Sequence, residues 1–179
     1  MSVQELRYFG DPVLKTTCDP VTDFGPRTAE LVTDLLESVD LPGRAGLAAN
    51  QIGVSLRAFS YNVDDQFGYV LNPEIVELAE EWDEIDEGCL SVPQLWFPTR
   101  RAVRAVCRGV DLRNEPVVVS GTGVLAQCLQ HETDHLDGLL YLDRLAPAER
   151  RKAMRAVRES DWFLPADPTP TASPWRLGR

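Results

Sequence analysis

The stretch Gln130-His131-Glu132-Thr133-Asp134-His135 restricts how the rest of the chain can fold. It lies in residues 122–137, where apolar residues recur at helical spacing and Gly138 stands where a helix C-cap belongs. The residues expected on the buried side of this helix are Val124, Leu125, Cys128, Leu129 and Leu136. Residues four apart share one helix face, so His131 and His135 can hold one metal ion with Glu132 directed toward its open side. The pattern therefore predicts a helix at the edge of a core with a candidate metal site.

A hydrolytic metal needs a third protein ligand, and the sequence leaves only a few residue types for it. Tyr141 stands where one class of metallopeptidases has a third histidine, and the chain has only two histidines, which excludes that class. A second class uses a downstream glutamate. Glu149 and Glu159 are available, but they lie in an arginine-rich segment where surface salt bridges suit them better. The remaining candidate is a cysteine, which binds such metals as the thiolate.

The rest of the chain predicts a single α+β domain around this helix. With 179 residues, 44% of them apolar and 26% charged, the chain can bury one core. Residues 3–24 are turn-rich and extended. We expect helices over residues 26–39 and 147–160, and strands over residues 56–61, 69–71, 74–82, 101–110 and 116–119. We therefore predict a compact domain over residues 1–163, with antiparallel strands packed around the helix that carries HExxH. Residues 164–179 form a Pro-rich tail with too little apolar content to fold alone.

Charge and composition also restrict the compartment and the partners. No apolar run approaches the roughly 20 residues of a membrane helix, and the N-terminus lacks the pattern of a secretory signal, so we expect a cytoplasmic protein without a membrane partner. A net charge of −10 argues against binding DNA. Residues 149–158 are locally basic, which is typical of a solvated helix face but also of a surface that binds RNA or an acidic partner. The four cysteines do not indicate a disulfide framework in this compartment.

Three segments together resemble the signature motifs of the peptide deformylase family, in the family's order. They are Gly46-Leu47-Ala48-Ala49-Asn50-Gln51-Ile52-Gly53, Glu87-Gly88-Cys89-Leu90-Ser91 and the histidine stretch at residues 130–135. Gly10-Asp11-Pro12-Val13-Leu14 is also similar to that family, and the resemblance covers about residues 3–160. It implies a metal-dependent hydrolase that removes the formyl group from the N-formylmethionine of nascent polypeptides and releases formate.

The resemblance also implies residue roles. Cys89, His131 and His135 would be the metal ligands, and Glu132 the general acid and base. The side-chain amide of Gln51 and the backbone N–H of Leu90 would stabilise the oxyanion. The residues that would contact substrate are Ala45, Gly46, Glu87 and Gly88. Glu87 would also pair with Arg101 and brace the Cys89 loop. The family typically uses Fe²⁺, which Zn²⁺, Ni²⁺ or Co²⁺ can replace. We further expect a monomer whose basic C-terminal helix docks at the ribosome.

Some positions depart from the family's pattern, and two other functions stay open. Arg44 replaces a glycine and Ala45 replaces a bulkier apolar residue, which leaves peptide preference undetermined. Gln127 stands where the pocket wall is usually apolar, which predicts a more polar methionine pocket. An endopeptidase would use a glutamate as third ligand and have no role for Cys89. A metal-binding or ribosome-associated protein with a degenerate site would have lost Glu132 or Gln51, and both are present.

Overall fold

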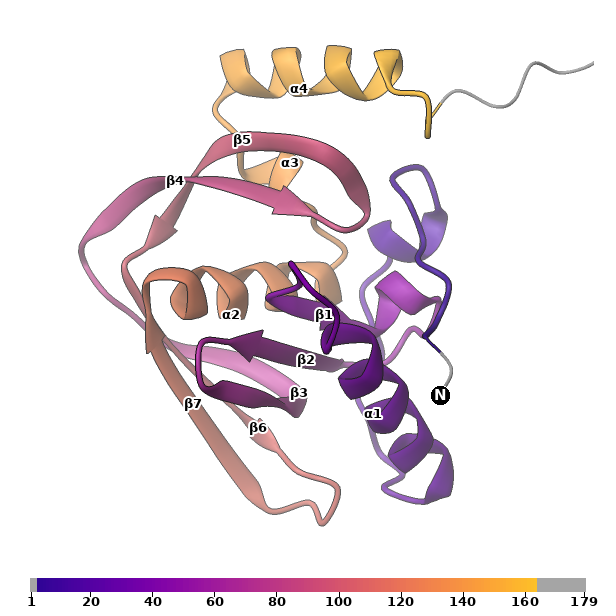
Figure 1. Cartoon of the computed structure of the whole chain (residues 1–179). Helices are drawn as coiled ribbons and strands as arrows, with labels where there is room; N and C mark the ends of the chain where they lie inside the picture. The colour runs from indigo at the N-terminus through magenta and orange to yellow at the C-terminus, as the bar shows by residue number, and fades with distance from the viewer. Residues whose placement is uncertain (1–2, 164–179) are drawn as a thin grey trace, which may run out of the picture.

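Helix α2 (Gly123–Leu136) lies between two antiparallel sheets in the computed structural model, which describes residues 3–163 (Figure 1). The larger sheet has five strands in the order β1 (Gly46–Ala48), β2 (Ala58–Val63), β3 (Gln66–Leu78), β6 (Arg104–Val110) and β7 (Pro116–Thr122). The smaller sheet is the hairpin of β4 (Trp82–Cys89) and β5 (Val92–Ala102). The other helices are α1 (Pro26–Val39), α3 (Tyr141–Arg144), α4 (Pro147–Glu159) and the short 3₁₀ turns η1 (Pro12–Lys15) and η2 (Ala49–Ile52). This arrangement confirms the predicted α+β fold.

The C-terminal part of α2 is buried. Every residue from Cys128 to Leu136 is buried, including the polar ones. A buried polar group needs a hydrogen-bond partner. The Gln130 side chain meets this need at β5, where its amide donates to the carbonyl of Ala102 at 3.0 Å and accepts from the Ala102 N–H at 3.1 Å. Gly138 ends the helix at a φ of 74°, as the C-cap prediction required.

The strand predictions were right in type and wrong in extent. The predicted strands at residues 69–71 and 74–82 merge into the one strand β3, which ends at Leu78, and Trp82 begins β4. The prediction missed β5 almost entirely, and its strand at residues 101–110 spans the end of β5 and all of β6. The β4–β5 hairpin escaped prediction because its acidic strand lacks alternation. Its register aligns Asp83 with Arg101 and Glu84 with Arg100, so charged residues occupy positions where an apolar alternation would have marked a strand.

The helices follow their predicted positions. The helices α1 and α4 begin at a proline, at Pro26 and Pro147. Apolar spacing predicted α1, and the proline just inside its start predicted α4. The turns η1 and η2 and the single-turn helix α3 were not predicted, because each is shorter than the window in which periodicity can be measured. The predicted Pro-rich tail at residues 164–179 lies outside the described residues.

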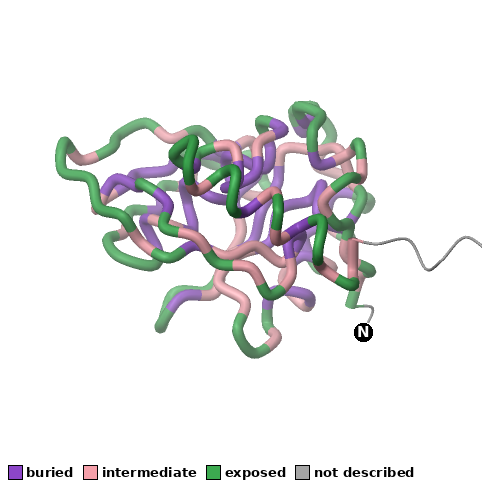
Figure 2. Tube along the Cα trace, turned by 90° about the horizontal axis from the view of Figure 1, so that it is seen from above, coloured by how far each residue is buried: buried purple, intermediate pink, exposed green. Residues whose placement is uncertain are grey.

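Buried residues form three neighbouring clusters that together hold the site in place. One packs α2 against one face of the five-stranded sheet, one packs α1 against the opposite face of that sheet, and the third packs α3 and α4 against β5. Figure 2 shows the buried segments inside and the exposed ones at the turns and outer edges. Among residues 3–163, no helix is both long and apolar enough to cross a membrane.

Candidate metal centre

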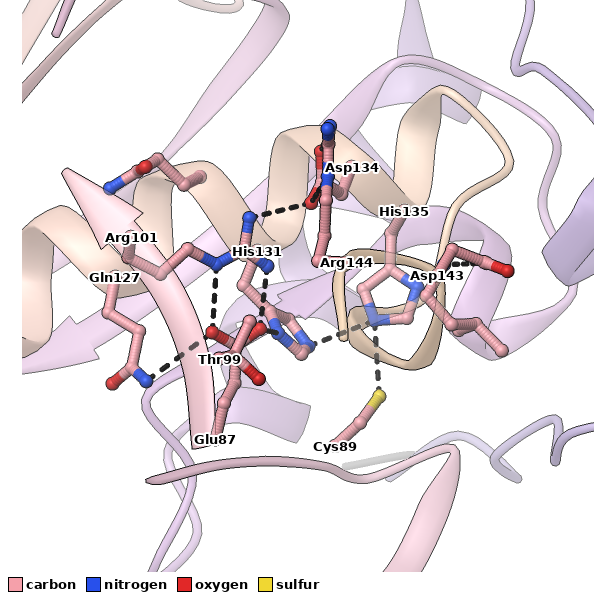
Figure 3. Close-up of polar contacts among 12 residues, drawn as sticks. Glu87, Cys89, Thr99, Arg101, Gln127, His131, Asp134, His135, Asp143 and Arg144 are labelled. Carbon is pink, nitrogen blue, oxygen red and sulfur yellow. Dashed lines mark hydrogen bonds and ion pairs between the residues drawn. The ribbon is translucent and has the colours of Figure 1, made fainter. Parts of the chain in front are cut away.

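Three potential metal ligands meet beside α2. Cys89 is the last residue of β4, while His131 and His135 lie one turn apart on α2. The Sγ atom of Cys89 is 3.2 Å from Nε2 of His135, which is 3.1 Å from Nε2 of His131 (Figure 3). The ligand atoms of all three lie within 4.8 Å of one another, and no second group of this kind occurs in residues 3–163. A thiolate and two imidazole nitrogens that face one point fit a divalent transition metal.

The two histidines differ in their electrostatics. Burial would lower the pKa of His131, but the hydrogen bonds with Cys89 and Glu87 outweigh it and raise that pKa well above its ordinary value. Burial lowers the pKa of His135 well below its ordinary value, and the neighbouring His131 lowers it further. A neutral imidazole nitrogen carries the lone pair that a metal needs. Nδ1 of His131 lies 2.6 Å from Oε1 of Glu87, so this ring is oriented from behind by a carboxylate. Such a partner fixes the tautomer that leaves Nε2 free to bind.

Glu132 lies next to the three ligands with one oxygen unused. It is 3% exposed, and its Oε2 atom has no hydrogen-bond partner in the structure. Burial raises the pKa of Glu132 to about 7, and the charge of Glu87 raises it too, while His131 opposes the shift. A buried carboxylate without a partner is costly unless a ligand or water completes it. Glu132 is therefore free to exchange a proton with a group bound in the site.

The side chain of Gln51, which belongs to η2, also extends to the metal-ligand group. Its Oε1 accepts from the Ala48 N–H at 2.9 Å, which fixes the orientation of the amide. Its Nε2 then points to Sγ of Cys89 at 3.6 Å and to Oγ of Ser91 at 3.2 Å. Leu90 follows Cys89 directly and lines the same cleft. The structure thus places a side-chain N–H donor next to Cys89, with Leu90 at the edge of the site.

A buried ionic network supports the ligands from the far side. Arg101 donates from Nε and Nη2 to the two oxygens of Glu87 at 2.8 and 2.6 Å, as the Glu87–Arg101 prediction required. Its Nη1 donates to Oδ2 of Asp134 at 2.7 Å. Arg144 donates to both oxygens of Asp134 (Figure 3). Burial would raise the pKa of Glu87, but the hydrogen bonds from Arg101 and His131 outweigh it and lower the pKa to about 2. Glu87 is consequently ionised at any working pH.

A cleft of about 510 Å³ opens over the site. The residues with predicted substrate contacts all line it, namely Ala45, Gly46, Glu87 and Gly88. Both oxygens of Glu87 are engaged by Arg101 and His131, so its carboxylate faces the network. The prediction that Val124 lies on the buried side of α2 was wrong, because Val124 is exposed. Together with the exposed Trp96 it lines the cleft and gives it an apolar edge.

Two departures from the family pattern also lie at this cleft. Gln127 lines it, and its amide points to the carbonyl of Asp86 and to Oε2 of Glu87, each at 3.4 Å. Arg44 lines it too, but its Nη1 donates to the carbonyl of Ser38 in α1 at 2.7 Å. The alternative ligand Glu149 instead pairs with Lys152 at 2.6 Å on the exposed side of α4.

Comparison with known proteins points in the same direction as this geometry. The family model for polypeptide deformylase matches residues 3–151. The chain belongs to the peptide deformylase family. It is 53% identical over 163 residues to a peptide deformylase of Acidothermus cellulolyticus, covering 90% of this chain and 89% of the relative. It is 46% identical over 178 residues to one from a Parafrankia species, covering 99% and 97%.

Solved peptide deformylases share the fold. The structure from Thermus thermophilus is 38% identical with a TM-score of 0.81, over 88% of this chain and 94% of that one. The structure from Ehrlichia chaffeensis in complex with actinonin is 31% identical with a TM-score of 0.82, over 90% and 99%. As a member of the peptide deformylase family, the chain is a hydrolase of protein biosynthesis, and its Cys89–His131–His135 group agrees with a metal-dependent family.

Sequence reasoning missed several residues around this peptide deformylase site. Asn50 donates from Nδ2 to the carbonyl of His135 at 2.6 Å, and Ser91 donates its N–H to Sγ of Cys89 at 3.4 Å. Asp134 and Arg144 had no assigned role either. Asn50 and Ser91 lie next to residues that were singled out, and that adjacency was the available signal. Nothing in the sequence indicated Arg144, because only the turn after α2 brings its side chain back to Asp134.

Proposed function

We propose that this chain hydrolyses the formamide bond at the N-terminus of N-formylmethionyl peptides, with a bound metal ion, water and Glu132. The observation that carries the proposal is the unpartnered, buried Oε2 of Glu132 beside the Cys89–His131–His135 group, under a cleft open to solvent. Membership of the peptide deformylase family supports the substrate class. The products are formate and a free α-amino terminus.

In this proposal Cys89, His131 and His135 hold one divalent ion. We propose Fe²⁺ as the working metal, with Zn²⁺, Ni²⁺ or Co²⁺ able to replace it, since one thiolate and two imidazoles suit all four. When bound, the ion supplies Lewis acidity toward the formyl oxygen and the attacking water. The protein residues orient the reactants and move the proton.

Glu132 is the proton carrier of the reaction. Its carboxylate takes a proton from the water that attacks the formyl carbon, and it delivers that proton to the amine as the C–N bond breaks. The attack places negative charge on the former carbonyl oxygen. The Gln51 amide and the Leu90 backbone N–H donate to this oxygen, and one such donor is typically worth about 3 kcal/mol in the transition state. The contact between Gln51 and Ala48 supports this role, because it holds the amide oriented before substrate binds.

The walls of the cleft bind the peptide. Ala45, Gly46 and Gly88 line the cleft, and the peptide backbone runs beside them in this proposal. The missing side chains of Gly46 and Gly88 leave room for Glu132 and Trp96. Glu87 contributes indirectly, by fixing the ring of His131, since Arg101 and His131 occupy its carboxylate. The polar side chain of Gln127 lines this cleft and makes its wall more polar in this proposal.

The experiment that tests the function measures formate release. The protein is prepared with Fe²⁺ without oxygen and given formyl-Met-Ala-Ser. We expect stoichiometric formate and Met-Ala-Ser, and no reaction with acetyl-Met-Ala-Ser under the same conditions. An internal peptide such as acetyl-Ala-Met-Ala-Ser-amide serves as the test for the endopeptidase alternative. Cleavage of that peptide, or the absence of formate from metal-loaded protein, contradicts the proposal.

We also propose that α4 docks the enzyme, as a cytoplasmic monomer, on the ribosome. Arg151, Arg155 and Arg158 are exposed on α4, and no ion pair with them occurs among residues 3–163. Free cations on an otherwise acidic chain favour an RNA surface. Changing these three to Glu is expected to abolish salt-sensitive co-sedimentation with ribosomes, whereas Arg113→Glu in the β6–β7 turn has no effect. Equal binding of both variants contradicts the docking site.

A further inference from the structure

We infer that Arg144 is a positioning residue for the metal centre, acting through Asp134, Arg101 and Glu87 on the ligand His131. This rests on the proposed metal site and adds a residue outside the cleft to the machinery of the reaction. Arg144 is the last residue of α3, and its side chain is 47% exposed. By itself it would be counted as half of a surface ion pair, which usually contributes little.

The contacts of Arg144 are unlike those of a surface pair. Nε donates to Oδ2 of Asp134 at 3.0 Å and Nη2 donates to Oδ1 at 2.6 Å, so the guanidinium holds both oxygens. A bidentate pair prevents the carboxylate from rotating. Oδ2 of Asp134 also accepts from Nη1 of Arg101 at 2.7 Å, and the Asp134 side chain is 8% exposed. Arg144 therefore decides where the buried carboxylate presents Oδ2 to Arg101.

The pair of Arg101 and Glu87, which lies nearer to the metal ligands, is bidentate as well. The other edge of the Arg101 guanidinium holds both oxygens of Glu87, and Oε1 of Glu87 lies 2.6 Å from Nδ1 of His131. Two bidentate pairs in series transmit position, because neither carboxylate can turn without breaking a contact (Figure 3). The positive charges of Arg101 and Arg144 also offset the negative charges of Glu87 and Asp134. Removal of Arg144 leaves Asp134 with one cation, which it must then share with Glu87, so Glu87 holds the ring of His131 less firmly.

Access to Arg144 does not pass through the substrate cleft. Arg144, Asp134 and Arg101 line a second cavity of about 350 Å³, and no residue lines both this cavity and the cleft. Arg57 lines the second cavity as well and pairs with Asp137 at 2.7 Å. Its other hydrogen bonds go to the backbone carbonyls of Leu136 and Pro73, so they do not connect it to Arg101. Arg57 thus offers a control of equal charge at the same end of α2.

The test compares Arg144→Ala, Arg144→Lys and Arg57→Ala in the Co²⁺-loaded protein. The readouts are the rate at which a chelator removes the metal and the visible absorption spectrum of the bound Co²⁺. Loss of a residue that orients a metal ligand typically costs 10- to 100-fold in metal affinity, and we expect about tenfold faster release for Arg144→Ala with a shifted spectrum. Arg144→Lys keeps the charge but loses the bidentate geometry, so its release rate is expected between those of wild type and Arg144→Ala. Arg57→Ala is expected to match wild type.

Chemical rescue gives an independent readout. Millimolar guanidinium can enter the second cavity of Arg144→Ala and occupy the place beside Asp134, and it is expected to restore slow release and the original spectrum. Urea has the same planar shape without charge and is expected to have no effect. Wild-type spectrum and release in Arg144→Ala overturn the inference while the metal site stands. Failure of wild type to bind Co²⁺ overturns the proposed site and this inference together.

Discussion

Gly46 lies directly against the carboxylate of Glu132. A Cβ atom added at residue 46 would overlap Oε1 of Glu132, and it would lie 2.7 Å from Sγ of Cys128. Neither neighbour can move away easily, because Glu132 and Cys128 are both buried in α2. Residue 46 on strand β1 must therefore be a glycine to leave room for the carboxylate of Glu132, the proposed acid-base residue.

We predict that Gly46→Ala impairs turnover while metal stays bound, because the added methyl displaces Glu132 and leaves the three ligands in place. Loss of a positioned acid-base group costs typically 10²- to 10⁴-fold, and we expect the lower end of that range. The measurement is kcat on formyl-Met-Ala-Ser with metal content determined on the same sample. Gly43→Ala is the control for backbone strain, because nothing lies within 4 Å of its added Cβ but its φ of 81° disfavours any side chain. Equal loss in both variants would assign the effect to strain in the loop.

Glu132→Ala should keep its bound metal and lose nearly all activity. The carboxylate is outside the three-ligand group, so elemental analysis should find a full complement of metal. Turnover should fall by about 10²- to 10⁴-fold, because no other group takes the proton from water. Normal turnover in the metal-loaded variant would remove Glu132 from the mechanism.

Cys89→Ser should lower metal retention and activity together. The thiolate supplies one of three ligand atoms and neutralises part of the charge of the ion. Cys18→Ser is a suitable control, since Cys18 is a buried cysteine away from this group. Both variants are compared by metal content after dialysis and by formate release. A full metal complement with unchanged turnover in Cys89→Ser would make Cys89 a purely structural residue.

Metal removal should expose one thiol to alkylation. Burial raises the pKa of Cys107 to about 12, and it raises the pKa of Cys18 and of Cys128 also, so these three stay protonated and enclosed at pH 8. Cys89 is partly exposed where it lines the open cleft, whereas Cys128, which also lines this cleft, is only 4% exposed. Iodoacetamide should therefore add one group to metal-free protein, mapped to Cys89 by mass spectrometry, and none to metal-loaded protein. Adducts on the other cysteines of native protein, or no protection by metal, would contradict this.

Arg44 should influence both stability and peptide choice. Its Nη1 donates to the carbonyl of Ser38 in the last turn of α1, where a cation is favourable. We expect Arg44→Gly to lower the free energy of unfolding by about 0.5–1 kcal/mol. The guanidinium also lines the cleft, so the variant should lose up to about 1 kcal/mol of preference for an acidic residue after formyl-methionine. The measurement is kcat/KM for matched acidic and neutral peptides at two salt concentrations. An unchanged ratio at low salt would confine Arg44 to its role at the end of α1.

The sequence by itself determined the histidine helix, the helices α1 and α4, and the α+β class. These depend on local spacing: His131 and His135 share a helix face at four-residue separation whatever surrounds them, and the apolar spacing of residues 26–39 places one face inward. The motif at Cys89 could be matched to a family, but residue spacing alone did not bring that cysteine to the helix.

Tertiary structure decided how β4 pairs and how the site is assembled, because the contacts that form them join residues far apart in the chain. The sequence of β4 is acidic and does not by itself predict a strand. Its pairing with β5 fixes the position of Cys89, whose sulfur then lies next to His135. The network from Arg144 to Glu87 draws on α3, α2, β5 and β4, so no sequence window contains it. The physical reason is that a side chain acquires its partner, its burial and its pKa from the neighbours that folding supplies, and periodicity reports only which face of its own element it occupies.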